Sequence, residues 1–308
     1  MRNTITALLW IAPFALHSAD AWAWGLYTHL YFSQLLLWAI PLADTRFRRA
    51  IKRFPELLLA GACLPDVSLF SGWVRDPRLA TTHQWSVAQR LLQDADHDEH
   101  AALAAGYCSH LLSDIIAHNH FVPTHETLWL NPLPLAVHAA SEWAMDAHLA
   151  EQLYASPHRL LRRHLPVITG FASHHFNSTP ADTRRALRYL AHGEQWLRGS
   201  GLHHAAYRGA RLMDAGVTRR FDYYVAQTTL RLEQMNRVIA GDAPAWAPEV
   251  ECAATARNNI HTGAPRHSPQ FIPLPRDFFS RNGNQATKPK ESAAIAAPSS
   301  APTSTSLG

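Results

Sequence analysis

The stretch from 101 to 123 combines helix-forming residues with side chains that can bind a metal ion. His110, Asp114 and His118 stand at positions i, i+4 and i+8, so on a helix they would lie along one stripe. His120 follows near the end of the same helix. Burying imidazoles and a carboxylate without partners is costly, and a metal ion would satisfy all of them. The alternative is a helix with one polar face, since a histidine and an aspartate at this spacing also occur together by chance.

A second pair of the same kind lies further along the chain. His138 and Glu142 are again four residues apart, and Asp146 continues their face of a helix. The sequence contains 20 histidines but only three cysteines, which favours metal sites of imidazole and carboxylate over thiolate sites. The composition and the two pairs together predict metal binding through nitrogen and oxygen ligands.

Other polar clusters have simpler interpretations. The connection 94–100, Asp-Ala-Asp-His-Asp-Glu-His, could hold a cation, but a solvated loop is the preferred interpretation. The pairs at 174–175 and 203–204 are histidines without partners at helical spacing, which indicates surface or loop positions. A net charge of +4 would suit an anionic partner, although the basic residues are scattered.

The first residues have the character of a secretory signal. Arg2 gives a positive start, residues 5–16 are mostly apolar, and Ala-Trp-Ala at 21–23 fits a small-x-small cleavage site. We predict that residues 1–23 are removed, so that Trp24 begins the mature protein and the protein is exported, to the periplasm or out of the cell. An uncleaved anchor is the alternative, but the apolar run is shorter than the roughly 20 residues that a spanning helix needs.

The rest of the chain predicts an all-α fold. Apolar residues recur with helical rather than alternating spacing, and proline and glycine separate the segments. We expect one multi-helix domain over residues 24–250, built around a buried metal cluster. Residues 251–308 should form an irregular to disordered tail rich in Ala, Ser, Pro and Thr. The expected helices cover residues 30–40, 46–60, 84–92, 101–123 and 135–154, with several more between 159 and 241 and a loop at 124–134.

The candidate ligands, taken in chain order, resemble those of the zinc-dependent phospholipase C superfamily. This superfamily also includes secreted single-strand nucleases and the lipase domain of GPI-specific phospholipase D. The resemblance runs from Trp24 to about Tyr154. Its most specific feature is the predicted cleavage before Trp24, five residues ahead of His29, because members bind zinc through a mature N-terminal tryptophan. The two histidine–carboxylate pairs follow in the family's order.

The resemblance implies three zinc ions per chain. Two of them would be paired through a shared carboxylate, and the third would use the pair on the later helix. For the third ion the nuclease-type pattern points to His120 and the phospholipase D pattern to His118; His120 is preferred. The implied ligands are Asp66, His83, His110 and Asp114 for the first ion, Trp24, His29 and Asp114 for the second, and His138, Glu142 and His120 (or His118) for the third.

The resemblance also implies an enzyme that cleaves phosphoester bonds with metal-activated water, since zinc lowers the pKa of bound water and stabilises charge on phosphoryl oxygens. Asp66 could act as an additional general base or serve as a ligand only. A phospholipid substrate is preferred, with a possible peripheral contact to a membrane surface through 128–130, Leu-Trp-Leu. A nuclease of the same fold, acting on nucleic acid, is one alternative, and an exported zinc-binding protein without catalysis is the other. Nothing in the sequence predicts the oligomeric state.

Overall fold

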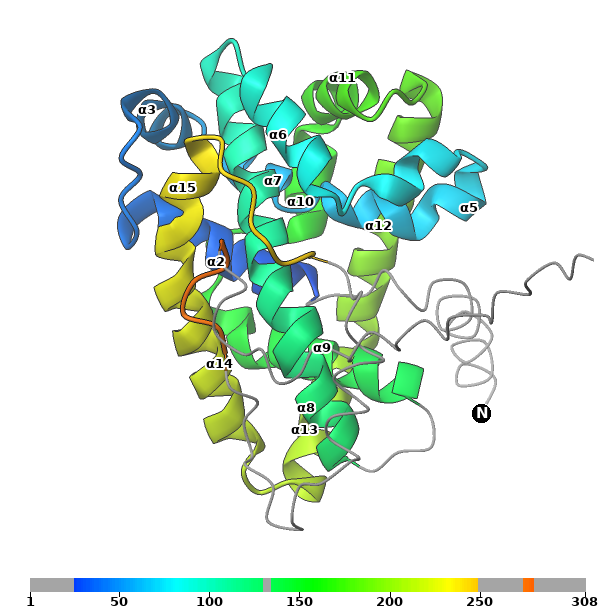
Figure 1. Cartoon of the computed structure of the whole chain (residues 1–308). Coiled ribbons are helices and arrows are strands. Elements are labelled where there is room, and N and C mark those ends of the chain that lie inside the picture. The colour runs from blue at the N-terminus through cyan, green and yellow to red at the C-terminus, as the bar shows by residue number, and fades with distance from the viewer. Residues whose placement is uncertain (1–24, 130–133, 249–273, 280–308) are drawn as a thin grey trace, which may run out of the picture.

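The computed structural model describes residues 25–129, 134–248 and 274–279. The predicted signal segment, Trp24 and most of the predicted tail lie outside these ranges. Within them the chain is helical and contains no strand, so the predicted all-α class is confirmed. Figure 1 shows the helices arranged around one long central helix, α7.

The helices and short helical turns vary in length, and the first is labelled α2. In chain order they are α2 (Leu26–Trp38), α3 (Thr45–Arg53), α4 (Pro55–Gly61), η1 (Pro65–Phe70), α5 (Ser71–Val74), η2 (Pro77–Thr81), α6 (Trp85–Gln93), α7 (Asp98–Ile116), η3 (Ala117–Phe121), α8 (Val122–Leu128), α9 (Pro134–Leu149), η4 (Ala150–Gln152), α10 (Pro157–Arg163), α11 (Leu165–His175), α12 (Pro180–Ser200), α13 (Leu202–Met213), α14 (Val217–Arg231), η5 (Leu232–Gln234) and α15 (Met235–Ile239).

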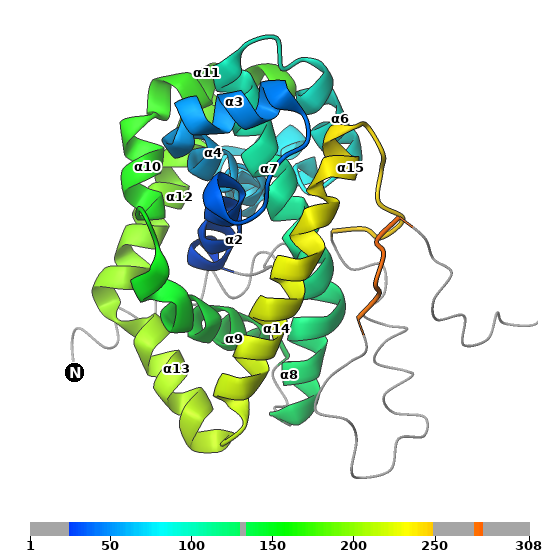
Figure 2. The same cartoon turned by 90° about the vertical axis from the view of Figure 1, so that its left-hand side faces the viewer.

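Helix α7 is buried along its whole length from Ala101 to Ile116, because α2, α3, α4 and α6 pack around it (Figure 2). Glycine permits the closest of these crossings. A Cβ at Gly106 would lie 1.9 Å from the Leu58 carbonyl oxygen, so only glycine fits where α4 crosses α7. The close crossing brings the end of α4, and η1 after it, against the middle of α7.

Proline explains two differences from the expected helices. The helix expected over 46–60 is divided at Phe54, since Pro55 lacks an N–H group and restricts the backbone of the residue before it. Pro123 stands in the first turn of α8, where a missing N–H costs little. The chain therefore continues as helix to Leu128, where a loop from 124 was expected.

Among the helices of the described ranges, none alone is both long enough and apolar enough to cross a membrane. One bent pair, Pro55–Gly61 with Pro65–Val74, passes the same test of length and composition.

Candidate metal centre

Four elements bring five of the predicted ligands together at the middle of α7. Two overlapping groups form, one of Asp66, His83 and His110 and one of His29, His110 and Asp114. In each group the potential ligand atoms lie within 4.8 Å of one another. His29 comes from α2, Asp66 from η1, and His83 from the segment before α6. All five side chains are buried, and Asp66 is the most exposed at 5%.

The distances within this cluster converge on His110. Its Nε2 atom lies 3.0 Å from Asp114 Oδ2, 3.2 Å from His83 Nε2 and 3.7 Å from Asp66 Oδ1. On the other side of Asp114, Oδ1 lies 3.3 Å from His29 Nε2. A bridging carboxylate thus faces two imidazole groups, as the paired zinc ions of the prediction would require.

Hydrogen bonds at the far side of two rings orient them toward the cluster. The Nδ1 atom of His110 lies 2.8 Å from the Ala62 carbonyl oxygen, which can only accept, so Nδ1 carries a proton. The hydroxyl of Ser113 donates to the carbonyl of His110 and can accept from His29 Nδ1 at 3.1 Å. In the neutral rings both Nε2 atoms then present lone pairs to the cluster, as metal-binding histidines do.

The electrostatics of the cluster call for a cation. Burial lowers the pKa of His110, but the carboxylates of Asp114 and Asp66 outweigh it and raise this pKa to about 9. Burial raises the pKa of Asp114, against the opposing effect of His110. Neither Asp114 oxygen accepts a hydrogen bond of good geometry. Buried carboxylates among imidazoles need a compensating positive charge, and this nitrogen and oxygen donor set fits zinc.

A further group lies beyond the end of α7. His138 Nε2 is 2.7 Å from Glu142 Oε1, one turn apart on α9. The ring of His118 lies 5.9 Å from that of His138, and its Nε2 atom is buried without a hydrogen bond. Burial raises the pKa of Glu142 to about 7, although His138 acts against this. These three residues offer two imidazoles and a carboxylate, which are donor types that zinc binds.

His120, the preferred third ligand of the sequence interpretation, points elsewhere. Its ring lies 5.9 Å from the ring of Trp246, and neither of its ring nitrogens has a hydrogen bond. The reason is the π-helical turn Ala117–Phe121, whose wider backbone changes the direction of residues after Ile116. The geometry therefore favours His118, the alternative, for the group with His138.

The sequence interpretation did not identify the partners of Asp146. This buried carboxylate accepts hydrogen bonds from the backbone N–H (2.9 Å) and the hydroxyl (2.7 Å) of Thr28, and it pairs with Arg198. A Cβ at Gly25 would lie 2.1 Å from Asp146 Oδ2, so a larger residue there would displace this carboxylate. Asp146 thereby fixes the start of α2 and the approach of His29. Its place beside Glu142 was visible in the sequence, but its contacts 118 residues away were not.

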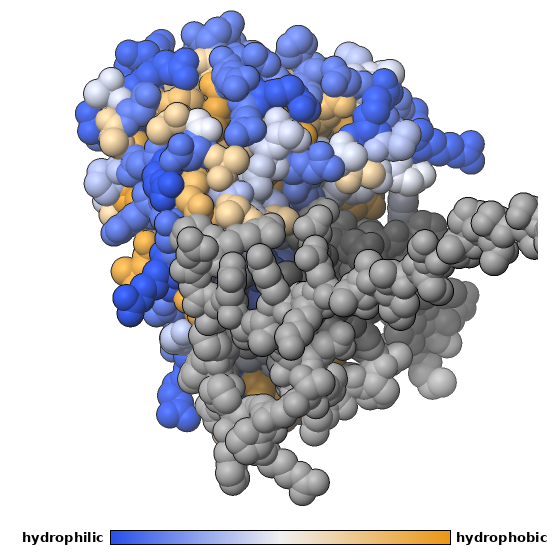
Figure 3. Space-filling view, viewed as in Figure 1, coloured by the Kyte–Doolittle hydropathy of each residue, from blue (hydrophilic) through white to orange (hydrophobic). Residues whose placement is uncertain are grey.

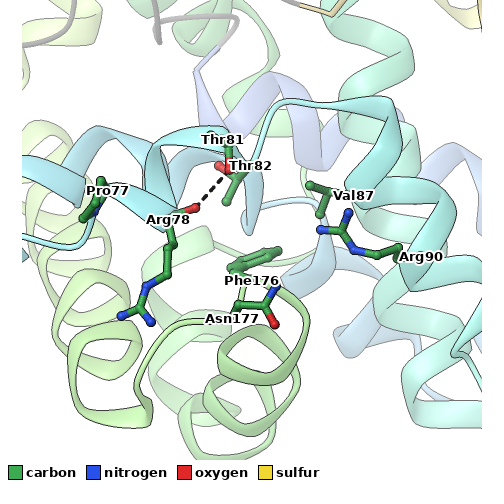
Figure 4. A pocket seen from close by; sticks show the side chains of 8 residues that line it. All are labelled: Pro77, Arg78, Thr81, Thr82, Val87, Arg90, Phe176 and Asn177. Carbon is green, nitrogen blue, oxygen red and sulfur yellow. Dashed lines mark hydrogen bonds between the residues drawn. The ribbon is translucent and has the colours of Figure 1, made fainter.

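The remaining predicted ligand, Trp24, lies outside the described residues. A pocket of about 340 Å³ between η2, α6 and α11 is separate from the predicted ligands, because none of them is among the residues that line it (Figure 4). Its lining includes Arg78, whose carbonyl accepts a hydrogen bond from Thr81.

A helical protein with a buried histidine–carboxylate centre is thus established on structural grounds. The model of the zinc-dependent phospholipase C family matches residues 28–199, and the chain belongs to this family. The matched segment contains every predicted ligand except Trp24. Membership supports a zinc-dependent hydrolase of phosphoester bonds, with phospholipid as the substrate class. Neither the curated proteins nor the solved structures contain a significant match.

Proposed function

We propose that this protein is an exported, phospholipase C-type phosphodiesterase that uses three zinc ions to hydrolyse a phosphoester bond of phospholipids. The single observation that carries the proposal is the pair of buried groups that share His110. Because the two groups have a residue in common, two metal positions would lie side by side. Paired metal ions are the arrangement used in phosphoester hydrolysis.

In this proposal each residue of the cluster has a definite task. His83 and His110 would hold the first ion and His29 the second, with Asp114 shared between them. When bound, zinc activates water and stabilises charge on the phosphoryl oxygens. Asp66 reaches nearer the surface than its neighbours and its Oδ1 atom is 3.4 Å from His83 Nε2. Besides binding the first ion, Asp66 accepts the proton of the attacking water at a carboxylate oxygen.

The third ion is assigned to His118, His138 and Glu142. The 2.7 Å contact between His138 and Glu142 and the unpartnered Nε2 of buried His118 support this assignment. A neutral Glu142 would be a poor ligand, so a cation is expected to displace its proton near neutral pH.

Export is part of the proposal because the second ion needs a free amino terminus at Trp24. Cleavage after Ala23 would create that amine next to Gly25, which packs against Asp146 at the start of α2. Zinc binding and export would thus be connected: the unprocessed chain lacks one ligand.

An apolar end of the molecule supports contact with a lipid surface. Leu212 and Met213 at the end of α13 are 89% and 71% exposed, and Leu128 is 36% exposed. The indole of Trp129 donates to Asp214, which brings the ends of α8 and α13 together at the lower end of the molecule in Figure 2. Exposed apolar residues of this kind mark binding surfaces.

The test uses the processed protein beginning at Trp24. Zinc per chain is measured by mass spectrometry, and the same sample is assayed with phosphatidylcholine vesicles and with single-stranded DNA. We expect at least three zinc ions and release of a phosphorylated head group. Cleavage of DNA instead would assign the nuclease function, and one zinc ion or none with neither substrate cleaved would overturn catalysis.

The lipid contact has its own test. Leu212→Gln with Met213→Gln should lower hydrolysis of vesicles while leaving hydrolysis of a soluble short-chain phospholipid unchanged, because the end of α13 lies away from the cluster. Equal activity of variant and parent on vesicles would refute the contact.

A further inference from the structure

The connection between α6 and α7 gathers a second, separate set of potential metal ligands. Asp96, His97 and His100 place one ligand atom each within 4.8 Å of the others. The carboxylate of Asp96 contacts His97 Nδ1 directly and lies 3.4 Å from His100 Nδ1. The two imidazole rings lie 3.8 Å apart. One carboxylate oxygen thus faces two ring nitrogens.

The local backbone explains this arrangement. His97 has an extended backbone directly before α7, and its side chain does not cap the helix. His100 follows one turn later, so both rings project from the same end of α7. This end is at the top of Figure 1, and the surface around it is largely hydrophilic in Figure 3. A metal ion could reach these side chains from solvent, since Asp96 and His97 are exposed.

Helix α11 adds a buried histidine to this surface group. The His175 ring lies 6.2 Å from the His100 ring, and its Nδ1 atom is 3.6 Å from Asp94 Oδ2. His175 is only 5% exposed, and its Nε2 atom makes no hydrogen bond. The pair at 174–175 was expected at the surface, but α11 packs beside α6 and buries its second member. A buried imidazole whose Nε2 atom has no hydrogen bond therefore lies behind the three ligands.

The neighbouring charges leave Asp96 available to a cation. Asp98, two positions after Asp96, is bound by the guanidinium groups of Arg49 and Arg53. The hydrogen bond with His97 lowers the pKa of Asp96, so this carboxylate is ionised at neutral pH. Burial lowers the pKa of His100, so its imidazole is neutral there and can bind metal.

We propose that Asp96, His97 and His100 form a surface site for one divalent transition-metal ion, with zinc as the fitting occupant. Imidazole nitrogen and a single carboxylate are a donor set for zinc and its neighbours rather than for calcium or magnesium. His175 is a positioning residue that supports the His100 ring from α11.

This site is independent of the proposed enzymatic centre. His100 and His110 are ten residues apart on α7, which corresponds to about 15 Å along the helix axis. The proposal therefore holds or fails whether or not the buried cluster is catalytic.

The experiment compares three forms of the full chain: the parent, His97→Ala with His100→Ala, and a control with His192→Ala and His204→Ala. The control also removes two exposed histidines, from α12 and α13. Each protein is dialysed against the same zinc-buffered solution, and metal content and titration with ZnCl2 are measured. We expect the first variant to bind one zinc ion fewer than parent and control, with phospholipid hydrolysis unchanged.

Equal zinc content in all three forms would overturn the site. So would a parent whose affinity for the zinc ion added in the titration is less than about tenfold higher than that of the first variant. Asp96→Asn provides a second, conservative variant, which keeps the side-chain shape but removes the charge. It should also lose the additional ion. NiCl2 serves as a second probe. Nickel bound at the surface site should add a visible absorption band to the spectrum of the parent, and the first variant should lack this band.

Discussion

His110 and His125 are both completely buried and lie on one nearly continuous run of helix, yet their surroundings shift their pKa values in opposite directions. The pKa of His110 rises to about 9 despite burial, because Asp114 and Asp66 lie beside it. Burial lowers the pKa of His125 to about 3. Its neighbours are the aromatic rings of Phe121, Trp129 and Phe221. One environment attracts positive charge, and the other excludes it.

The comparison separates burial from metal binding. A buried histidine costs little free energy when it stays neutral and its one N–H finds an acceptor, as His125 does at the Phe121 carbonyl. A metal position requires carboxylates from other elements in addition. His118 lies between these extremes. Burial lowers its pKa, and the neighbouring His138 lowers it further. The carboxyl group of Glu142 contacts His138 and not His118 itself.

The region around His110, with Asp114 and Asp66, is the charged side of this comparison, and the region around His125 is the aromatic side. The largest expected effect comes from removing a group on the charged side. His110→Ala and Asp114→Asn should each reduce phospholipid hydrolysis to background and lower zinc content, since both side chains serve the shared centre. Activity is followed by release of phosphorylated head group and zinc by mass spectrometry.

The matched control for these variants is His125→Gln, which removes an equally buried imidazole from the aromatic side. It should keep the zinc content and the activity of the parent, at some cost in stability. A comparable loss of zinc from His125→Gln and His110→Ala would mean that burial alone, and not the carboxylates, distinguishes the two regions.

A smaller effect is expected between the two regions, where His118 and His120 stand two positions apart. His118→Ala should remove one zinc ion and most of the activity, because its ring faces His138. His120→Ala should keep all the zinc, because its ring faces Trp246. The reverse result would restore the ligand preferred from the sequence, and equal, mild effects would remove both from the site.

The His118 and His120 pair also marks how far the sequence could lead. Helical spacing correctly grouped His110 with Asp114, and the order of the pairs led to the family that the comparison confirmed. The π-helical turn at Ala117–Phe121 could not be foreseen, since the choice between α- and π-helical hydrogen bonds depends on tertiary packing.

Other differences between the sequence prediction and the structure have distinct causes. The break at Pro55 was readable, because a proline in this position marks a helix start, and it was missed by joining a basic helix and an apolar helix into one. The contacts of Asp146 with Thr28 and of His175 with Asp94 could not be predicted, because they join residues about 80 to 120 positions apart through the packing of separate helices.

A more subtle test of the charged side concerns the residue that orients His29. Ser113→Ala removes the hydroxyl 3.1 Å from His29 Nδ1 and should weaken zinc binding about 10- to 100-fold, as is usual for partners of metal-binding histidines. Affinity is measured by competition with a chelator. Ser109→Ala is the control, since Ser109 lies one turn earlier on α7 and donates to the Gly106 carbonyl instead. Equal affinities in the two variants would show that orientation of His29 does not depend on Ser113.

The smallest expected effect tests the aromatic side by pH. The unfolded pKa of His125 is near 6.5 and the folded pKa is about 3, so the folded state resists protonation and stability contributed by neutral His125 is lost as pH falls below 6.5. Through this residue the protein should be about 1.4 kcal/mol less stable at pH 5.5 than at pH 8. His125→Phe, less stable at pH 8 because it leaves the Phe121 carbonyl without its partner, should lose that much less stability over the same interval in urea unfolding of the metal-free proteins. Equal losses in parent and variant would mean that His125 is protonated in the folded state and that the aromatic side does not exclude charge.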